Sequence, residues 1–142
     1  MTSLSSETLH ATSVAIDGRA VLIEGRSGSG KSDLALRLID RGAVLVSDDY
    51  TVLVRRDGRL MARPPATIAG RIEVRGLGIV PMPHVEDVPV ALIVRVDGEV
   101  LRMPERRVRR LADVEVPELA LAPFEASAPI KLEMALRGGT KA

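Results

Sequence analysis

The sequence of 142 residues contains no cysteine, no tryptophan, one phenylalanine and one tyrosine. Without cysteine, the chain can form neither a disulfide nor a thiolate metal site. Hydrophobic residues make up 46% of the chain and aromatic residues only 1%, so the core must be built from aliphatic side chains. No run of 18 apolar residues occurs, and the first ten residues lack the basic and apolar regions of a secretory leader. These absences favour a cytoplasmic protein.

Net charge is nearly absent as well, because 20 basic and 19 acidic residues leave +1. This balance gives no reason to expect nucleic acid or a membrane surface as a partner. The length suits one ordinary domain, so we expect residues 1–142 to form a single domain. Only three of the basic residues are lysines, Lys31, Lys131 and Lys141. A lysine at a position that suits a compact point charge therefore stands out.

Three Asp-Gly pairs separate segments rich in β-forming residues, which is a hairpin signal. They predict that residues 10–16 pair with 19–24, residues 50–56 with 59–63, and residues 90–96 with 99–103. Apolar residues at helical spacing, followed by glycine, predict helices over residues 31–41 and 128–139. The patterns together predict an α/β fold with few helices and a mixed, largely antiparallel sheet.

A glycine-rich segment follows the strand at 20–24 and opens the first predicted helix. It consists of Gly25, Arg26, Ser27, Gly28, Ser29, Gly30, Lys31 and Ser32. In this context the backbone N–H groups converge on a phosphate, the lysine reaches the β- and γ-phosphates, and the serine hydroxyl ligates Mg²⁺. An accidental Gly/Ser turn is the alternative, but chance seldom produces the full pattern in a chain of this length. We expect a Walker A phosphate-binding loop that binds a nucleotide.

The next predicted strand, residues 43–47, ends in Asp48 and Asp49. Paired acids after a strand are common turn residues, and that alternative stays open. After a phosphate-binding loop, however, phosphoryl transfer needs a carboxylate beside the metal and a group that orients or deprotonates the nucleophile. Two carboxylates allow one to lie near Mg²⁺ and the other to accept a hydroxyl proton.

His10 in the first predicted strand and the segment RIEVRGLGIV at 71–80 complete a set of four motifs. Taken singly, His10 is typical of a half-buried strand residue, and Glu73 and Arg75 are typical of a solvated face. Together with the loop and the acid pair, they resemble the HPr kinase/phosphorylase family, specifically its C-terminal catalytic domain. The likeness covers about half the chain, and the tail at 121–136 is similar to the short form found in alphaproteobacteria.

The resemblance implies a P-loop kinase domain of PEP carboxykinase-like fold that uses ATP and Mg²⁺. Its substrate would be a serine of the phosphocarrier protein HPr in the phosphotransferase system, and its assembly a homohexamer. The segment Gly25 to Ser32 would hold the ATP phosphates. Ser32, Asp48 and Glu73 would lie at the Mg²⁺.

The resemblance also implies catalytic roles for individual side chains. Lys31 would act on the phosphates, and Asp49 matches the family's general base, which takes the proton from the substrate serine. His10 matches the histidine that hydrogen-bonds and polarises this acid. Arg102 falls where the family places an arginine implicated in transition-state charge, although the surrounding residues match poorly.

The sequence departs from the family pattern in two places. Full-length members carry a separate N-terminal domain ahead of the region that matches. They also carry a basic Pro-Gly-Arg-Asn run near the C-terminus that is tied to dephosphorylation, whereas residues 125–133 here read EASAPIKLE, without arginine. We therefore expect phosphorylase activity to be weak or absent.

Two other classes of protein fit the phosphate-binding loop, a small-molecule P-loop kinase and a non-catalytic nucleotide-sensing module. The first would need a lid, and the run RRVRR at 106–110 could be taken for one. That run has two further interpretations. It is either a solvated helix or loop face, or a dock for an acidic or phosphorylated partner that would be sensitive to salt.

Overall fold

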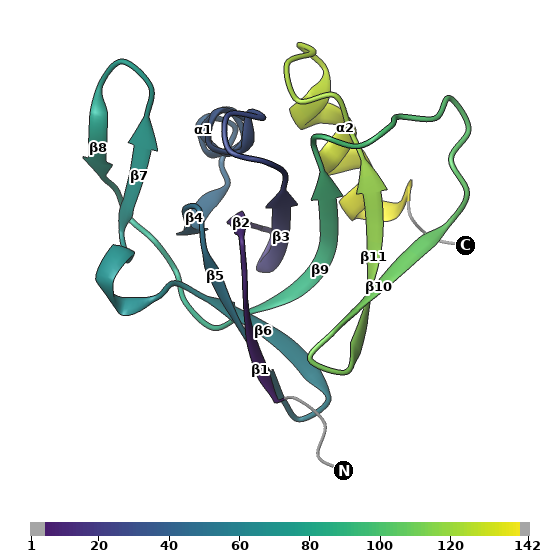
Figure 1. Cartoon of the computed structure of the whole chain (residues 1–142), viewed down its shortest axis with the longest axis horizontal. Helices are drawn as coiled ribbons and strands as arrows, with labels where there is room; N and C mark the ends of the chain where they lie inside the picture. Colours follow the sequence, from purple (N-terminus) through teal and green to yellow (C-terminus); the bar gives the residue numbers. More distant parts are fainter. Residues whose placement is uncertain (1–4, 140–142) are drawn as a thin grey trace.

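The computed structural model describes residues 5–139. Within this part, nine strands form one curled, mixed sheet, two strands form a separate hairpin, and helices α1 and α2 complete the fold (Figure 1). The main-sheet strands are β1 (Ser6–Leu9), β2 (Ala11–Ile16), β3 (Arg19–Glu24), β4 (Val44–Ser47), β5 (Thr51–Arg56), β6 (Arg59–Arg63), β9 (Val88–Arg95), β10 (Arg107–Leu111) and β11 (Val114–Ala120). The remaining elements are α1 (Lys31–Asp40), a 3₁₀ turn (Ala66–Ile68), β7 (Arg71–Val74), β8 (Gly78–Pro81), α2 (Ala128–Met134) and a π turn (Ala135–Gly139).

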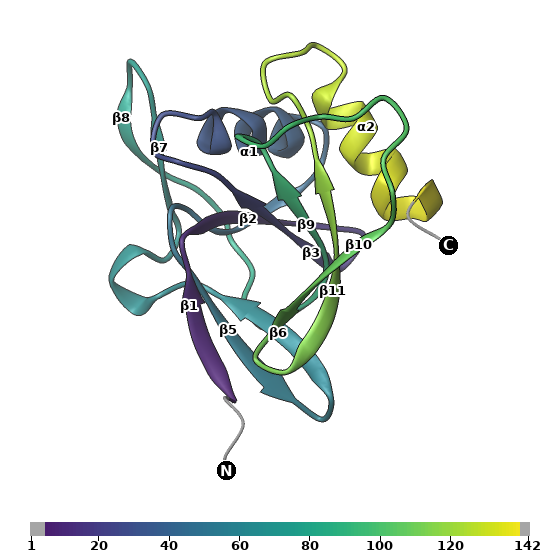
Figure 2. The same ribbon diagram turned by 45° about the vertical axis from the view of Figure 1, so that its right-hand side comes forward.

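The middle strands of the sheet are covered on both faces, because the sheet curls back on itself (Figure 2). Its order is β1-β5-β6-β9-β3-β2-β4, with β11 paired to both β9 and β10. Helices α1 and α2 lie side by side over β2, β3 and β9, and β5 and β6 lie on the other side (Figure 2). This arrangement makes the sheet an α/β fold with few helices and mostly antiparallel neighbours, as the sequence predicts. Within residues 5–139, no helix is long and apolar enough to cross a membrane.

The core is aliphatic on both faces of the sheet. Side chains alternate along β3, so that Val21 and Ile23 pack with the helices while Ala20 and Leu22 pack on the opposite face. The helix side also holds Leu34, Leu38, Leu92 and Leu132, and the other side holds Leu53, Leu60, Ile93 and Val116. Each fully buried Val, Leu or Ile contributes roughly 1.5–3 kcal/mol, so a core of this size needs no aromatic residue.

One edge of the sheet collects the ends of four strands that run in the same direction. Strands β3, β9 and β11 are parallel neighbours, and β4 shares their direction because β2 lies antiparallel to both β3 and β4. The segments that leave these four ends therefore lie along one edge. In sheets with parallel strands this edge is where ligands bind.

The first two predicted hairpins are confirmed as β2–β3 and β5–β6, and both predicted helices are present. The third is wrong, because residues 99–103 form no strand and β9 instead pairs in parallel with β3 and β11. The Asp97 carboxylate does not serve a hairpin turn but accepts the backbone N–H of Arg26 at 2.9 Å. The hairpin that does form, β10–β11, turns at Ala112 and Asp113, both with left-handed backbone (φ 45° and 69°). This turn contains no glycine, so the Asp-Gly pattern does not predict it.

The basic run at 106–110 is neither a helix nor a loop face, because most of it forms strand β10. Arg109 binds two carboxylates, that of Glu24 at the end of β3 and that of Glu118 on β11. The hydrogen bonds that Arg109 donates to Glu24, with those it donates to Glu118, raise the pKa of Arg109, although partial burial opposes this. Arg109 thus joins the strand that leads into the phosphate-binding loop to the outer hairpin.

We predict that Arg109→Ala lowers the free energy of unfolding by about 2 kcal/mol, because it removes the hydrogen-bonded guanidinium from two partly buried carboxylates. Glu24 keeps a longer pair with Arg95, at 4.0 Å. The matched control is Arg110→Ala, which removes an exposed ion pair with Asp113. That change should cost less than about 1 kcal/mol. Urea unfolding at pH 7 measures both values. Equal losses of unfolding free energy in the two variants would show that the Glu24–Arg109–Glu118 contact stabilises the fold no more than a surface ion pair does.

Candidate functional site

A cleft of about 720 Å³ opens at the edge where the four strands end. Its walls come from the loop before α1, the first turns of α1, the end of β4, the β7–β8 hairpin and the segment before α2. It is lined by Ser27, Gly28, Gly30, Lys31, Ser32, Asp33, Leu36, Asp48, Asp49, Glu73, Val74, Arg75 and Phe124. Most of the residues that the sequence assigns to a phosphate and metal site are therefore brought together.

The loop before α1 is tightly packed. A Cβ added at Gly25 would lie 2.5 Å from Ser29 Oγ and 2.8 Å from a methyl group of Val96, so glycine is required there. Gly30 caps the helix in a left-handed conformation with φ 103°. The side chain of Lys31 is buried beneath the loop, and its Nζ donates to the carbonyl oxygens of Gly25 at 2.7 Å and Arg26 at 3.1 Å.

Asp97 fixes the start of this loop from the neighbouring strand. Its carboxylate accepts the Arg26 backbone N–H and pairs with the side chains of Arg26 and Arg95, each at 3.3 Å. The N–H of Arg26 is the largest cause that lowers the pKa of Asp97 below its ordinary value. The loop is therefore held in shape by a charged group that follows β9.

Asp48 is the buried centre of the site, with 7% of its surface exposed. Its Oδ1 accepts the Ser32 hydroxyl at 2.7 Å and the Thr12 hydroxyl at 3.1 Å. Its Oδ2 accepts the backbone N–H of Glu73 at 2.9 Å. One carboxylate therefore connects α1, β2 and the β7–β8 hairpin.

Asp49 has the opposite environment, with 56% of its side chain exposed at the cleft. Its backbone is left-handed, with φ 69°, and its N–H donates to Thr12 Oγ1 at 3.1 Å. His10, which immediately precedes β2, places Nε2 2.7 Å from Asp49 Oδ1. The ring of Tyr50 stacks on that of His10 with centroids 4.8 Å apart. The predicted proximity of His10 and Asp49 is thus present.

Of the two remaining predicted site residues, Glu73 lines the cleft and Arg102 does not. Glu73 lines the cleft at the end of β7, beside Asp48, and Arg75 in the following turn also lines it. Arg102 is exposed on segment 97–106 and is not among the described residues that line the cleft. Its role at the site stays a prediction.

The donor set fits a phosphate with Mg²⁺. The loop, the N-terminus of α1 and Lys31 offer N–H groups and one positive charge to an anion. The Ser32 hydroxyl and the Asp48 carboxylate are hydrogen-bonded to each other, so both can contact one ion. Oxygen donors of this kind are the ligands that Mg²⁺ prefers. Among residues 5–139, no three His, Asp or Glu side chains gather to hold a metal unaided.

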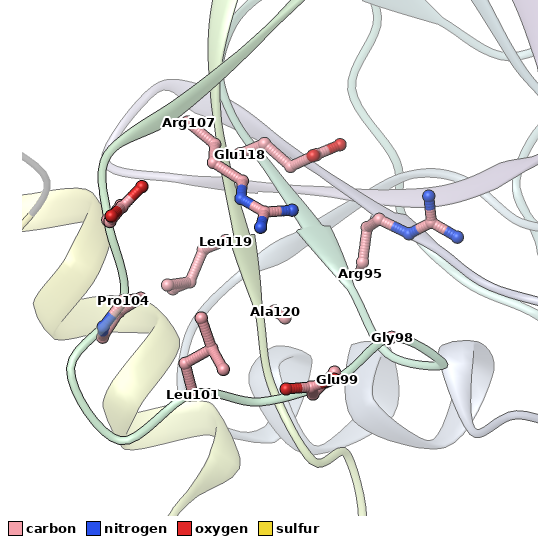
Figure 3. Close-up of a pocket in the computed structure, with 10 residues that line it drawn as sticks. Arg95, Gly98, Glu99, Leu101, Pro104, Arg107, Glu118, Leu119 and Ala120 are labelled. Carbon is pink, nitrogen blue, oxygen red and sulfur yellow. The ribbon is translucent and has the colours of Figure 1, made fainter.

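A second, smaller hollow of about 330 Å³ lies beside segment 97–106 (Figure 3). Leu101 of this segment lines it together with Leu119 and Ala120 of β11, and Arg95 and Arg107 stand at its margin. Neither the phosphate-binding loop nor the acid pair lines it. Residues of the phosphate-binding loop, both aspartates and Glu73 line the larger cleft instead.

Sequence reasoning missed four side chains that shape the site: Thr12, Tyr50, Asp97 and Phe124. Thr12 lies two residues after His10, and strand periodicity places both on one face, which was an available signal. Asp97 was visible only as a turn residue. The positions of Tyr50 and Phe124 depend on tertiary contacts that no local pattern reveals.

The chain is similar in sequence to known proteins over the part that contains the phosphate-binding loop and both aspartates. The family model described as HPr Serine kinase C-terminal domain matches residues 2–86. An HPr kinase/phosphorylase of Clostridium tetani is 38% identical over 103 residues, which are 72% of this chain and 34% of that protein. One of Clostridium beijerinckii is 49% identical over 78 residues, 54% of this chain and 26% of the relative. The chain thus spans about a third or less of the length of these curated relatives.

A solved structure also matches nearly the whole chain. The structure of the Hpr(Ser) kinase/phosphatase from Coxiella burnetii has a TM-score of 0.81 and 29% sequence identity, and the match covers 94% of this chain and 90% of that one. The family model covers more than half of the sequence and includes His10, the phosphate-binding loop, both aspartates and Glu73. The chain belongs to the family of HPr serine kinase C-terminal domains.

Proposed function

We propose that the chain is an ATP- and Mg²⁺-dependent kinase that transfers a phosphoryl group to a serine of an HPr-like phosphocarrier protein. The observation that carries this proposal is the contrast between two adjacent carboxylates. Asp48 is buried against the Ser32 hydroxyl, while Asp49 is exposed beside His10 in the same cleft. Such a pair suits two tasks, one on the metal side and one on the nucleophile.

The residues Gly25 to Ser32 bind the nucleotide phosphates in this proposal. Backbone N–H groups at the start of α1 face the anion, and the ammonium of Lys31 neutralises its charge. Ser32 and Asp48 hold Mg²⁺, with Glu73 as a further candidate from the hairpin wall. Mg²⁺ supplies charge neutralisation at the transferring phosphoryl group.

Asp49 acts as the general base. His10 occupies Oδ1 of the carboxylate, which leaves Oδ2 to accept the proton of the serine hydroxyl. The serine oxygen forms a bond to the γ-phosphorus, the bond from that phosphorus to ADP breaks, and the proton passes to Asp49. Stacking on Tyr50 fixes the plane of the His10 ring, so that the hydrogen bond to Asp49 keeps its direction.

The exposure of Asp49 and His10 favours a protein substrate over a small metabolite. Asp49 is more than half exposed and His10 is 40% exposed, so a serine carried on a protein surface can reach them. The run at 106–110, which resembled a lid in sequence, forms strand β10 with Arg109 tied to Glu24 and Glu118. It therefore offers no mobile cover for a small substrate.

The deciding experiment incubates the protein with γ-labelled ATP, Mg²⁺ and HPr. We predict label on a serine of HPr, and we predict that Lys31→Ala reduces transfer by about 100-fold or more, because the cation facing the phosphates is gone. Lys131→Ala is the matched control, since that lysine is exposed and pairs with Glu125. Near wild-type transfer by Lys31→Ala would refute the assignment. Label on a small molecule would favour a metabolite kinase, and nucleotide binding without transfer would favour a sensor.

The two aspartates should differ in phenotype. Asp49→Asn should reduce kcat by about 10²–10⁴-fold with nearly unchanged affinity for Mg·ATP, because it removes a proton acceptor used in the transition state. Asp48→Asn should instead raise the Mg²⁺ concentration required for activity. Steady-state kinetics at varied Mg²⁺ measure both effects. Asp57→Asn, in the exposed turn between β5 and β6, is the control. Exchanged phenotypes would mean that the two roles are reversed.

Phosphorylase activity, the transfer of phosphate from phosphoserine to inorganic phosphate, should be weak or absent. Removing phosphate from phosphoserine with inorganic phosphate as acceptor places two anions in the site, and their repulsion must be offset by additional positive charge. Residues 125–133 supply one lysine and no arginine, and Lys131 already pairs with Glu125. The test follows pyrophosphate release from serine-phosphorylated HPr with Mg²⁺ and millimolar phosphate. Release as fast as the forward reaction would contradict this expectation.

A further inference from the structure

Phe124 is the only phenylalanine of the chain, and it lies at the wall of the cleft with 70% of its surface exposed. Among the described residues that line the cleft, it is the only one with an aromatic side chain. None of the steps proposed above uses it. A flat apolar surface at the edge of a phosphate site has one obvious class of ligand, a planar ring.

The topology places Phe124 on the side of the loop away from the acids. Asp48 and Asp49 follow β4, which lies beyond β2 on one flank of β3. Phe124 follows β11, which lies beyond β9 on the other flank. The phosphate-binding loop follows β3 and lies between them. A nucleotide whose terminal phosphates face the acids therefore extends its other end toward the flank of Phe124.

The segment that carries Phe124 is held firmly against the loop. Arg37 of α1 donates hydrogen bonds to the carbonyl oxygens of Pro123 and Glu125, the two residues that flank the ring. The ring itself lies over Gly30, where an added Cβ would be 2.9 Å from the ring carbon Cζ. One edge of the ring thus lies against the last glycine of the loop, while most of the residue's surface is exposed and part of it lines the cleft.

We propose that the ring of Phe124 is the stacking platform for the purine base of the nucleotide whose phosphates the loop binds. The proposal rests on the nucleotide binding of the proposed function and adds the subsite for the base. Stacking of a base on an aromatic side chain strengthens binding by about 5- to 150-fold, and it is tolerant of base identity because every base has a π face. Phe124 therefore supplies affinity and positions the nucleotide, while it discriminates little between adenine and guanine.

The test separates the base from the phosphates. Isothermal titration measures the Kd of ADP and of inorganic tripolyphosphate, each with Mg²⁺, for wild type, Phe124→Ala and Phe124→Tyr. We expect Phe124→Ala to weaken ADP binding by about 5- to 150-fold and to leave tripolyphosphate binding unchanged. Phe124→Tyr should keep ADP binding within about threefold of wild type, because it keeps the aromatic face. Met103→Ala, a change of an exposed apolar residue on segment 97–106, is the control.

A spectroscopic measurement reports on the same contact directly. Because the chain has no tryptophan, Phe124→Trp introduces a single tryptophan at the wall of the cleft, whose emission can be excited selectively over that of Tyr50. Stacking of a base should quench its emission on addition of ADP, whereas tripolyphosphate should cause much less quenching. Equal responses to the two ligands would show that the ring senses the phosphates and not a base.

The outcomes distinguish this proposal from the proposed function. If Phe124→Ala binds ADP as wild type does, or loses ADP and tripolyphosphate equally, the stacking proposal is overturned and the ring instead packs the loop or docks the protein substrate. If ADP binding falls selectively but wild type labels no serine of HPr, the stacking subsite stands and the kinase proposal fails. If wild type binds neither ADP nor tripolyphosphate, both are overturned.

Discussion

The site depends on the hydrogen bonds to a single buried carboxylate. Asp48 accepts from Ser32, from Thr12 and from the backbone of Glu73, which belong to three different elements. Burying a carboxylate costs free energy unless its oxygens are hydrogen-bonded. Moving any of these three donors away would therefore destabilise the folded site. The β7–β8 hairpin is not part of the main sheet, and this contact, with Ile72 in the core, attaches it beside the loop. The β7–β8 hairpin can form a wall of the cleft for this reason.

The hydroxyl of Thr12 explains how two adjacent aspartates diverge. It donates to the Asp48 carboxylate and accepts the backbone N–H of Asp49, so it holds both residues from the neighbouring strand. The left-handed backbone at Asp49 then turns its side chain outward to His10. A regular continuation of β4 would also have separated the two side chains, but onto opposite faces of the sheet. The tight turn instead keeps both carboxylates in one cleft.

Local patterns predicted those parts of the fold in which the local chemistry and the tertiary contacts agree. The Asp-Gly pairs at 17–18 and 57–58 turn as hairpins, with both residues in the left-handed region that such turns require. The third pair has the same letters, but Asp97 is used by Arg26 of the loop, a contact 71 positions away in sequence. Conversely, Ala112 and Asp113 turn without glycine, and Asp113 is held there by Arg110 and Arg55. The misplaced strand and the missed hairpin both involve contacts between residues far apart in the sequence, Arg26 with Asp97 and Arg55 with Asp113, which local patterns do not reveal.

The scarcity of aromatic residues is itself an argument about the site. Both buried cores are packed with aliphatic and alanine side chains, so the fold does not need a ring to fill space. The only tyrosine and the only phenylalanine are exposed, and each lies against a functional element, Tyr50 on His10 and Phe124 on the phosphate-binding loop. An exposed aromatic side chain does not contribute the free energy that burial would give, and neither does an exposed aliphatic one. What an aliphatic side chain cannot offer is a flat π face, and a flat face is of use where a planar group must be oriented.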